Sequence, residues 1–338
     1  MSNCVNKSEK SSEVVLFFVN TPFQALCAVE AIKSFDIREY CFYVSYFHNE
    51  NRLNQIDAIL KLYNISYKSF LLKKTSVFSF LMKCTFKRKK YDKAFVGDYY
   101  TILFSLFSIF SLKCKGKLVY MDDGNSTIDI FKGRLAPSKN GLIAQRLRKI
   151  TMLIGMYRGI EVEKNFYSIF PDIPNPKYHV IENTFSHIRN DYNTNNYITL
   201  SLIVGTVLEG YCEENNLTKK QYHSALEELF IKAKNETANL LYIPHGRDRD
   251  SVVIDLCRRH NIEYRRLDVC IELYILQNGI LPKFVYGFSS SALYSLKKMF
   301  PEADVSNIRI VSSNPSKEYE DIAVYYHQHG INNVVYNV

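Results

Sequence analysis

The sequence predicts an α/β protein made of two doubly wound, Rossmann-like domains. Short apolar runs typical of buried strands alternate with helical patterns, which indicates parallel sheets covered by helices. The alternation breaks once, between about residues 170 and 197, and then restarts. The chain has 338 residues, more than one hydrophobic core usually holds, so two domains are expected, with bounds 1–175 and 176–338.

The first domain is expected to open with a buried strand at Val14–Val19 (VVLFFV), followed by a turn that places Pro22 at the start of a helix. The apolar run Thr101–Leu112 predicts a buried helix, because it is too short to span a bilayer. Further strands are expected at Cys41–Tyr46, Ala94–Val96 and Lys117–Met121, and a further helix near Arg52–Tyr63.

The break between the domains is marked by the prolines Pro171, Pro174 and Pro176 and by the polar stretch Asn190–Asn196. After it, strands and helices alternate again. The predicted strands are Thr199–Val204, Leu240–Ile243, Glu263–Leu267, Phe284–Tyr286 and Ile308–Val311; the predicted helices are Lys219–Lys234, Asp250–His260, Ser291–Met299 and Lys317–His327.

The composition and the N-terminal sequence indicate a globular cytoplasmic protein rather than a secreted one. Apolar residues make up 47% and charged residues 23%, which is typical of a globular soluble protein. The polar N-terminal stretch 1–13 has no apolar core of a secretory signal, so we expect a cytoplasmic location. The eight cysteines include no C-x-x-C pair and are expected to be buried free thiols in a reducing compartment.

The net charge of +9 is partly clustered in two basic runs. Such runs can be solvated helix faces or can bind anions. Both flank apolar stretches, Phe78–Met82 and Ile150–Met156, which favours peripheral contact with an anionic membrane over nucleic acid. No nucleic-acid motif accompanies them. The first run consists of Lys83, Lys87, Arg88, Lys89, Lys90 and Lys93, and the second of Arg146, Arg148, Lys149 and Arg158.

Four groups of polar residues follow predicted strands, where ligands bind in doubly wound sheets. Asp122-Asp123-Gly124 suits general-base chemistry, although Asp-Gly is also common in turns. A metal site is not expected there, because no second carboxylate cluster completes it. His245 precedes Gly246, which permits close approach of a ligand, and an imidazole can donate a proton or a hydrogen bond.

The third group extends from Gly287 to Ser291, with Ser289 and Ser290 at a helix start. Free backbone N–H groups, the helix dipole and the hydroxyls suit a phosphate, although an ordinary Ser N-cap has the same pattern. The sequence is neither a Walker loop nor G-x-G-x-x-G. The fourth is Glu272, which could accept both hydroxyls of a ribose or favour a helix dipole.

In this order, the motifs resemble those of the bacterial sialyltransferases that modify lipooligosaccharide, O-antigen and capsule, and more distantly those of bacterial polysialyltransferases. The matching residues are Asp122-Asp123-Gly124, His245, Glu272 and Ser289-Ser290. The stretch Asn20, Thr21, Pro22, Phe23 and Gln24 also resembles the N-terminal signature of the lipooligosaccharide enzymes and is expected at the cleft side of the first domain. The family usually has His-Pro, whereas this chain has His245-Gly246 with Pro244 before it.

The resemblance implies a GT-B fold, in which two Rossmann-like domains face a central cleft, the first binding the acceptor and the second the CMP-sugar. It implies an inverting, metal-independent transfer of sialic acid from CMP-sialic acid to a galactose-terminated bacterial glycan, with an α2,3 linkage. Asp122, or alternatively Asp123, would be the base, and His245 would meet the CMP phosphate. Ser289 and Ser290 would hold that phosphate, and Glu272 would bind the ribose. No cofactor is expected.

Three alternatives remain open at this stage. The chain could be a polysialyltransferase or another CMP-sugar transferase of the Kdo type. It could also be a nucleotide- or glycan-binding relative that has lost turnover. A peripheral membrane protein whose main role is contact with lipid is the third.

Overall fold

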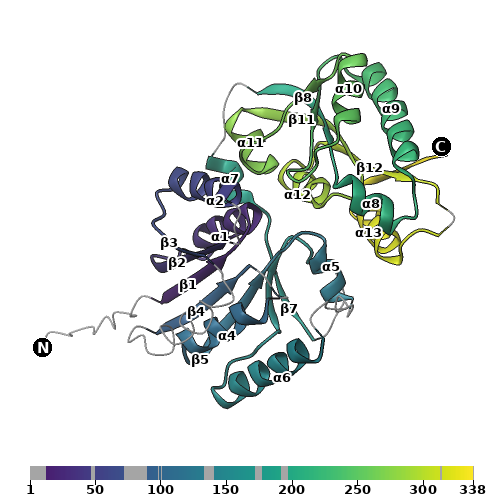
Figure 1. The fold of residues 1–338 in the computed structure, drawn as a ribbon. Helices are drawn as coiled ribbons and strands as arrows, with labels where there is room; N and C mark the ends of the chain where they lie inside the picture. The colour runs from purple at the N-terminus through teal and green to yellow at the C-terminus, as the bar shows by residue number, and fades with distance from the viewer. Residues whose placement is uncertain are drawn as a thin grey trace, which may run out of the picture. The chain divides into compact units, whose positions relative to one another are not determined.

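The computed structural model divides the chain into two compact units, each with one sheet (Figure 1). The first unit comprises Met1–Asp122, Pro137–Ser168 and Pro176–Ile181, and the second Asp123–Ala136, Ile169–Asn175 and Glu182–Val338. The structure describes residues 13–46, 50–71, 90–97, 99, 101–132, 141–171, 177–191, 197–312 and 314–337. The predicted domain boundary, between residues 175 and 176, lies outside these ranges.

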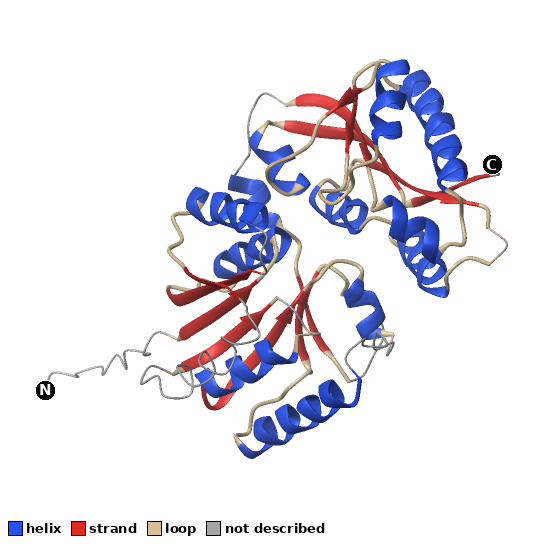
Figure 2. Ribbon diagram, in the orientation of Figure 1, coloured by secondary structure: helices blue, strands red, loops and turns tan. Residues whose placement is uncertain are grey.

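The first unit is a seven-stranded sheet with the order β3-β2-β1-β4-β5-β6-β7, and its determined strand pairs are parallel. Helices α1 and α2 lie on one side of the strands, and α4 and α6 on the other (Figure 2). The strands are β1 (Val14–Val19), β2 (Glu39–Tyr46), β3 (Lys68–Leu71), β4 (Tyr91–Val96), β5 (Leu112–Met121), β6 (Asn165–Ser168) and β7 (His179–Glu182). The helices are α1 (Pro22–Ser34), α2 (Glu50–Leu62), α4 (Ile102–Ser111) and α6 (Gly141–Tyr157).

The second unit repeats this arrangement with six parallel strands in the order β10-β9-β8-β11-β12-β13. Both sheets therefore have the strand order of a Rossmann fold, which confirms the predicted fold class. The strands are β8 (Ile198–Val204), β9 (Leu240–Ile243), β10 (Glu263–Tyr264), β11 (Ile280–Gly287), β12 (Asp304–Ile310) and β13 (Asn332–Tyr336). The helices are α5 (Ser126–Phe131), α7 (Ser186–Asp191), α8 (Leu208–Glu214), α9 (Lys219–Glu236), α10 (Ser251–Arg259), α11 (Ile271–Gln277), α12 (Ser291–Met299) and α13 (Lys317–Gln328).

The core of the first unit forms where the sequence is most apolar. Phe17 of β1 stacks on Phe42 of β2 and on Phe95 of β4, with ring centroids 5.4 and 5.0 Å apart. On the other face of β1, Phe18 contacts Phe104 and Phe107 of α4. The predicted strand Val14–Val19 is thus confirmed, and so is the buried helix predicted from the apolar run Thr101–Leu112.

The structure corrects several local predictions. The strand expected at Glu263–Leu267 ends at Tyr264: the Arg265 N–H makes a last bond to the Tyr242 carbonyl of β9, and the residues after it leave the sheet. Short elements such as β3, β6 and β7 were not predicted, since four residues carry too little periodicity. Most of the first basic run, and the apolar stretch Phe78–Met82 beside it, lie outside the described residues.

The cysteines in the described residues are free. Cys27, Cys212 and Cys257 are buried, as expected, whereas Cys114 is exposed because it lies on a solvent-facing part of β5. Within the described part of the chain, no helix is both long and apolar enough to cross a membrane.

A turn between β1 and α1 is locked by one buried side chain. The Thr21 hydroxyl caps α1 by accepting a hydrogen bond from the Gln24 N–H, at 3.2 Å. The Gln24 side chain turns back and accepts a bond from the Asn20 N–H, at 2.9 Å. Gly97, at the end of the neighbouring strand β4, leaves the space that this side chain needs: a Cβ there would lie 2.2 Å from Gln24 Oε1.

We therefore expect Gly97→Ala to lower the free energy of unfolding by about 1–3 kcal/mol, because Gln24 must shift or lose its bond. Urea denaturation measures the change. Gly210→Ala in α8 is the control, since a Cβ there meets nothing within 4 Å and should be neutral or slightly stabilising. Equal effects of the two substitutions would contradict this account of the turn.

Candidate functional site

The second sheet has a topological switch point between β8 and β11. These neighbouring strands pair in parallel, with Val204 opposite Gly287, and the strand order reverses between them. Ligands of doubly wound sheets bind outside the carboxyl ends of strands at such a point. The segments that leave the two strands here are Gly205-Thr206 and Phe288-Ser289, so the predicted serine motif lies at the switch point. Thr206 was not singled out from the sequence.

The serine loop is held in an unusual backbone conformation. Ser289 has a φ of +49°, a backbone angle that residues other than glycine rarely adopt. Its N–H donates a 2.8 Å hydrogen bond to Oδ1 of the buried Asn307 on β12. Ser290 is the N-cap of α12 and accepts a bond from the Ala292 N–H. The loop thus presents half-exposed serines at the positive end of the α12 dipole, which favours an anion.

The Asp-Asp-Gly motif meets the serine motif through Asn125. The Asn125 side chain donates a 2.8 Å hydrogen bond to the Ser289 carbonyl. Its Oδ1 lies 2.8 Å from the Tyr326 hydroxyl, which is also 2.9 Å from the Ser290 carbonyl. Gly124 has a φ of +68°, and a Cβ there would lie 3.1 Å from Ser291 Oγ. Two motifs more than 160 residues apart therefore pack against each other within the second unit.

The two acidic residues of the motif have different surroundings. Asp122 directly follows β5, is fully buried, and accepts a 2.6 Å hydrogen bond from Ser168 at the end of β6. Asp123 is half-exposed. Its N–H donates to Thr127 Oγ1 and its carbonyl accepts from the Ser126 hydroxyl, which fixes its backbone at the start of α5. A reactant from solvent can reach Asp123, whereas Asp122 is covered.

His245 follows β9 as predicted and is a neutral imidazole with a fixed tautomer. The Arg247 N–H donates a 3.1 Å hydrogen bond to Nδ1, so the imidazole proton is on Nε2. Burial, and then the charge of Arg247, lower the pKa of His245 to about 4. Gly205 permits this packing, because a Cβ there would lie 3.1 Å from the His245 N and 2.6 Å from the Tyr242 hydroxyl. His245 can therefore donate a hydrogen bond at neutral pH without carrying a charge.

Two arginines that the sequence reasoning missed fold onto the His245 loop. Arg266 donates to the carbonyls of Gly246 and Asp248, at 3.3 and 2.6 Å. Arg249 donates to the same two carbonyls, at 2.9 and 2.8 Å. The predicted strand Glu263–Leu267 includes Arg265 and Arg266, whereas β10 ends at Tyr264, so the sequence did not mark either arginine as a residue that follows a strand. Two guanidinium groups thus lie against the loop that carries His245.

Glu272 lies in the first turn of α11 and is 4% exposed. Its carboxylate accepts a hydrogen bond from the Ser295 hydroxyl of α12. Burial raises the pKa of the Glu272 carboxyl, and the bond from Ser295 opposes that shift. Glu272 therefore joins α11 to α12, the helix whose N-terminus carries the serine motif.

The remaining predicted residues, Asn20, Thr21, Pro22 and Gln24, lie at the carboxyl end of β1 in the first unit. They build the turn described above, and Gln24 is fully buried. This end of β1 is beside the end of β4, the switch point of the first sheet. Among the described residues, no group of three or more His, Cys, Asp or Glu side chains could hold a metal ion.

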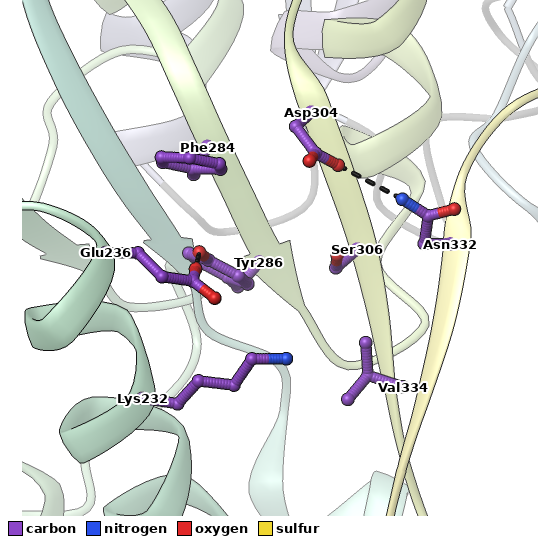
Figure 3. Close-up of a pocket in the computed structure, with 8 residues that line it drawn as sticks. All are labelled: Lys232, Glu236, Phe284, Tyr286, Asp304, Ser306, Asn332 and Val334. Atoms are coloured by element: carbon purple, nitrogen blue, oxygen red, sulfur yellow. Dashed lines mark hydrogen bonds between the residues drawn. The ribbon is translucent and has the colours of Figure 1, made fainter.

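A separate pocket of about 190 Å³ lies on the face of the second sheet, between α9 and strands β11 to β13 (Figure 3). Its polar groups are largely paired with one another: Glu236 accepts a bond from the Tyr286 hydroxyl, and Asp304 from the Asn332 amide. None of the predicted site residues lines it. The lining residues are Lys232, Glu236, Phe284, Tyr286, Asp304, Ser306, Asn332 and Val334.

Comparison with known proteins identifies the fold. No protein-family model matches the sequence, and no curated protein matches it. Solved structures do match. The UDP-GlcNAc 2-epimerase from Neisseria meningitidis bound to UDP-GlcNAc has a TM-score of 0.53 and 15% identity, with 94% of each chain covered. A further UDP-N-acetylglucosamine 2-epimerase gives 0.54 and 13%, with 97% of this chain and 84% of that chain covered.

The spinosyn forosaminyltransferase SpnP matches with a TM-score of 0.50 and 9% identity, over 96% of this chain and 86% of that one. These proteins have the GT-B fold, so the chain has this fold across most of its length, as expected from the sequence. At such low identity the likeness concerns the fold alone.

The neutral His245 makes stability depend on pH. Its folded pKa of about 4 is below the usual 6.5, so the unfolded chain binds more protons between these values. Stability is therefore highest, as far as His245 is concerned, above about pH 6.5, and the free energy of unfolding declines as the pH falls towards 4. We expect His245→Gln to reduce the decline in unfolding free energy over this range by about 1–2 kcal/mol. Denaturation at several pH values tests this, with the exposed His327→Gln as control. An unchanged decline would contradict the assignment.

The hydrogen bond from the Asn125 side chain to the Ser289 carbonyl is expected to hold the serine loop in place. Asn125→Ala should lower the free energy of unfolding by about 1–3 kcal/mol, because it leaves the partly buried Ser289 carbonyl without its partner. Amide hydrogen exchange should quicken at residues 289–292. Tyr326→Phe removes only one hydroxyl and should have a smaller effect on both measurements. Unchanged exchange in Asn125→Ala would show that the loop holds its shape without this hydrogen bond.

Proposed function

We propose that the protein is an inverting glycosyltransferase that moves sialic acid from CMP-sialic acid to a galactose-terminated bacterial glycan. The observation that carries the proposal is the bond from Asn125 to the Ser289 carbonyl. It packs the Asp-Asp-Gly turn against the serine loop, and these are two of the motifs on which the resemblance to sialyltransferases rests. A proton acceptor and an anion site are thereby close together, as transfer from a nucleotide-activated sugar requires.

The donor phosphate is assigned to the serine loop and to His245. When the bond to the sugar breaks, negative charge develops on the CMP phosphate. The N-terminus of α12, the hydroxyls of Ser289 and Ser290, and the Nε2–H of His245 would stabilise that charge. The guanidinium groups of Arg249 and Arg266 would add to the attraction. A bound phosphate would raise the His245 pKa, since the nearby anion favours imidazolium.

Asp123 is proposed as the base that takes the proton of the acceptor hydroxyl. It is half-exposed, whereas Asp122 is fully buried under its bond with Ser168. We propose Asp122 as a positioning residue that anchors the turn. The family resemblance favours Asp122 as the base, with Asp123 as the alternative; the exposure of Asp123 supports the reverse assignment.

Glu272 is proposed to bind the ribose of CMP. Its carboxylate is bonded to Ser295 and almost fully covered, so a ribose would need to approach through movement of α11. The proposal includes an α2,3 linkage and an O-antigen, lipooligosaccharide or capsule acceptor, which the family resemblance supports. No metal takes part in the proposed reaction. A cytoplasmic location is proposed as well, since it keeps the free cysteines reduced.

The test is incubation of the purified protein with CMP-sialic acid and labelled galactosides, with and without EDTA. We expect an α2,3-sialylated product in both conditions. Asp123→Asn should lower kcat by about 100-fold or more, because an amide cannot accept the proton. The matched control is Asp255→Asn, an exposed carboxylate of α10, which should leave kcat unchanged.

Several outcomes would overturn the proposal. Transfer of one residue to an existing sialic acid chain would indicate a polysialyltransferase, and use of CMP-Kdo another CMP-sugar transferase. CMP binding without turnover, unaffected by Asp123→Asn, would indicate an inert relative. Epimerisation of UDP-GlcNAc would assign the chain to the reaction named for two of its structural neighbours.

A further inference from the structure

Helix α6 carries an exposed apolar face that the proposed reaction does not use. Among the described residues, five of the 14 exposed large apolar side chains lie on this one helix. Tyr157 is 92% exposed, Met156 72% and Leu153 59%. Monomeric soluble proteins normally scatter such side chains singly. The five are Ile150, Met152, Leu153, Met156 and Tyr157.

These side chains share one face with two basic residues. Arg146 and Lys149 are exposed and stand three or four residues from Ile150, Leu153 and Met152, so they occupy the same side of the helix. The described positions of this face include no acidic residue. The face is therefore both apolar and positively charged.

The opposite face fixes how the helix is turned. Thr151 is buried on this face, with 2% of its surface exposed. Gly155 is buried so closely that a Cβ there would lie 2.3 Å from Val162 Cγ2. The remaining arginines of the basic run also have structural partners: Arg148 pairs with Glu163, and Arg158 donates to the carbonyls of Ile109 and Leu112. The helix cannot roll its apolar face inward without losing these contacts.

We propose that α6 binds the surface of an anionic membrane, with its exposed face inserted between headgroup and acyl chain. Interleaved basic and apolar side chains are the composition of helices that lie in this layer. Long arginine and lysine stems can reach up to lipid phosphates while the apolar side chains insert. Tyrosine, at the end of the helix, is favoured at that interface. The basic residues distinguish this surface from one that would pair with a second copy of the chain, where they would face like charges.

The experiment is flotation of the full chain with vesicles of phosphatidylcholine, alone or mixed with phosphatidylglycerol, in the absence of any nucleotide sugar. The wild-type protein should float with the anionic vesicles. Leu153→Glu/Met156→Glu should lower the partition coefficient more than 10-fold, because two charges replace inserting side chains. Arg146→Gln/Lys149→Gln should lower it about 30-fold on anionic vesicles only.

Matched controls change the same chemistry elsewhere. Ile231→Glu/Val324→Glu alters two exposed apolar residues of α9 and α13, and Lys220→Gln/Lys317→Gln removes two exposed positive charges. Both should bind like the wild type. Flotation does not depend on catalysis. The membrane proposal can therefore fail while the proposed transferase activity stands, and the transferase proposal can fail while membrane binding stands.

Three results would overturn the proposal. The wild type could fail to float with anionic vesicles. The α6 variants could float as well as their controls. Sedimentation without lipid could show a wild-type dimer that Leu153→Glu/Met156→Glu converts to a monomer, which would assign the face to a second copy of the chain.

Discussion

The hydrogen bond from Asn125 to the Ser289 carbonyl is the interaction on which the candidate site depends. Asp123 is only two residues before Asn125, so fixing the amide keeps the backbone of Asp123 near the start of α12. The serine loop needs this support, because Ser289 adopts a positive φ that costs free energy outside glycine. Asn125 from one side and Asn307 from the other hold both backbone groups of Ser289, its carbonyl and its N–H.

The arginines and His245 at this edge of the second sheet differ in charge. The arginines carry permanent charge but point into backbone carbonyls of the loop after β9. His245 is neutral and keeps a directed Nε2–H. In the proposed reaction, the fixed charge would attract the donor phosphate and the Nε2–H would orient it. The bound anion would then raise the proton affinity of the imidazole. That is the behaviour expected of a group that stabilises a departing phosphate.

The sequence predicted what depends on neighbouring residues. Apolar runs located the central strands, and the structure places Asp122-Asp123, His245 and Ser289 just after the ends of β5, β9 and β11, where the sequence placed them. The sequence could not predict the partners of these residues. Asn125 looks like an ordinary turn residue until a carbonyl 164 positions away is beside it, and Arg266 was lost because a two-residue strand, β10, has no periodicity to mark its end. Burial distinguishes Asp122 from Asp123 in the structure. It depends on the tertiary fold, so the sequence could not tell two adjacent aspartates apart in this way.

The second basic run shows the same limit for charge. Four basic residues between positions 146 and 158 look like one patch in the sequence, yet the helical period divides them. Arg148 points inward to Glu163 and lies over the Tyr99 ring, and Arg158 bonds to two carbonyls. Only Arg146 and Lys149 are left on the outer face, among five apolar side chains. In the proposed membrane contact, the apolar side chains would insert into a bilayer of any charge, and the two basic residues would add the preference for anionic headgroups.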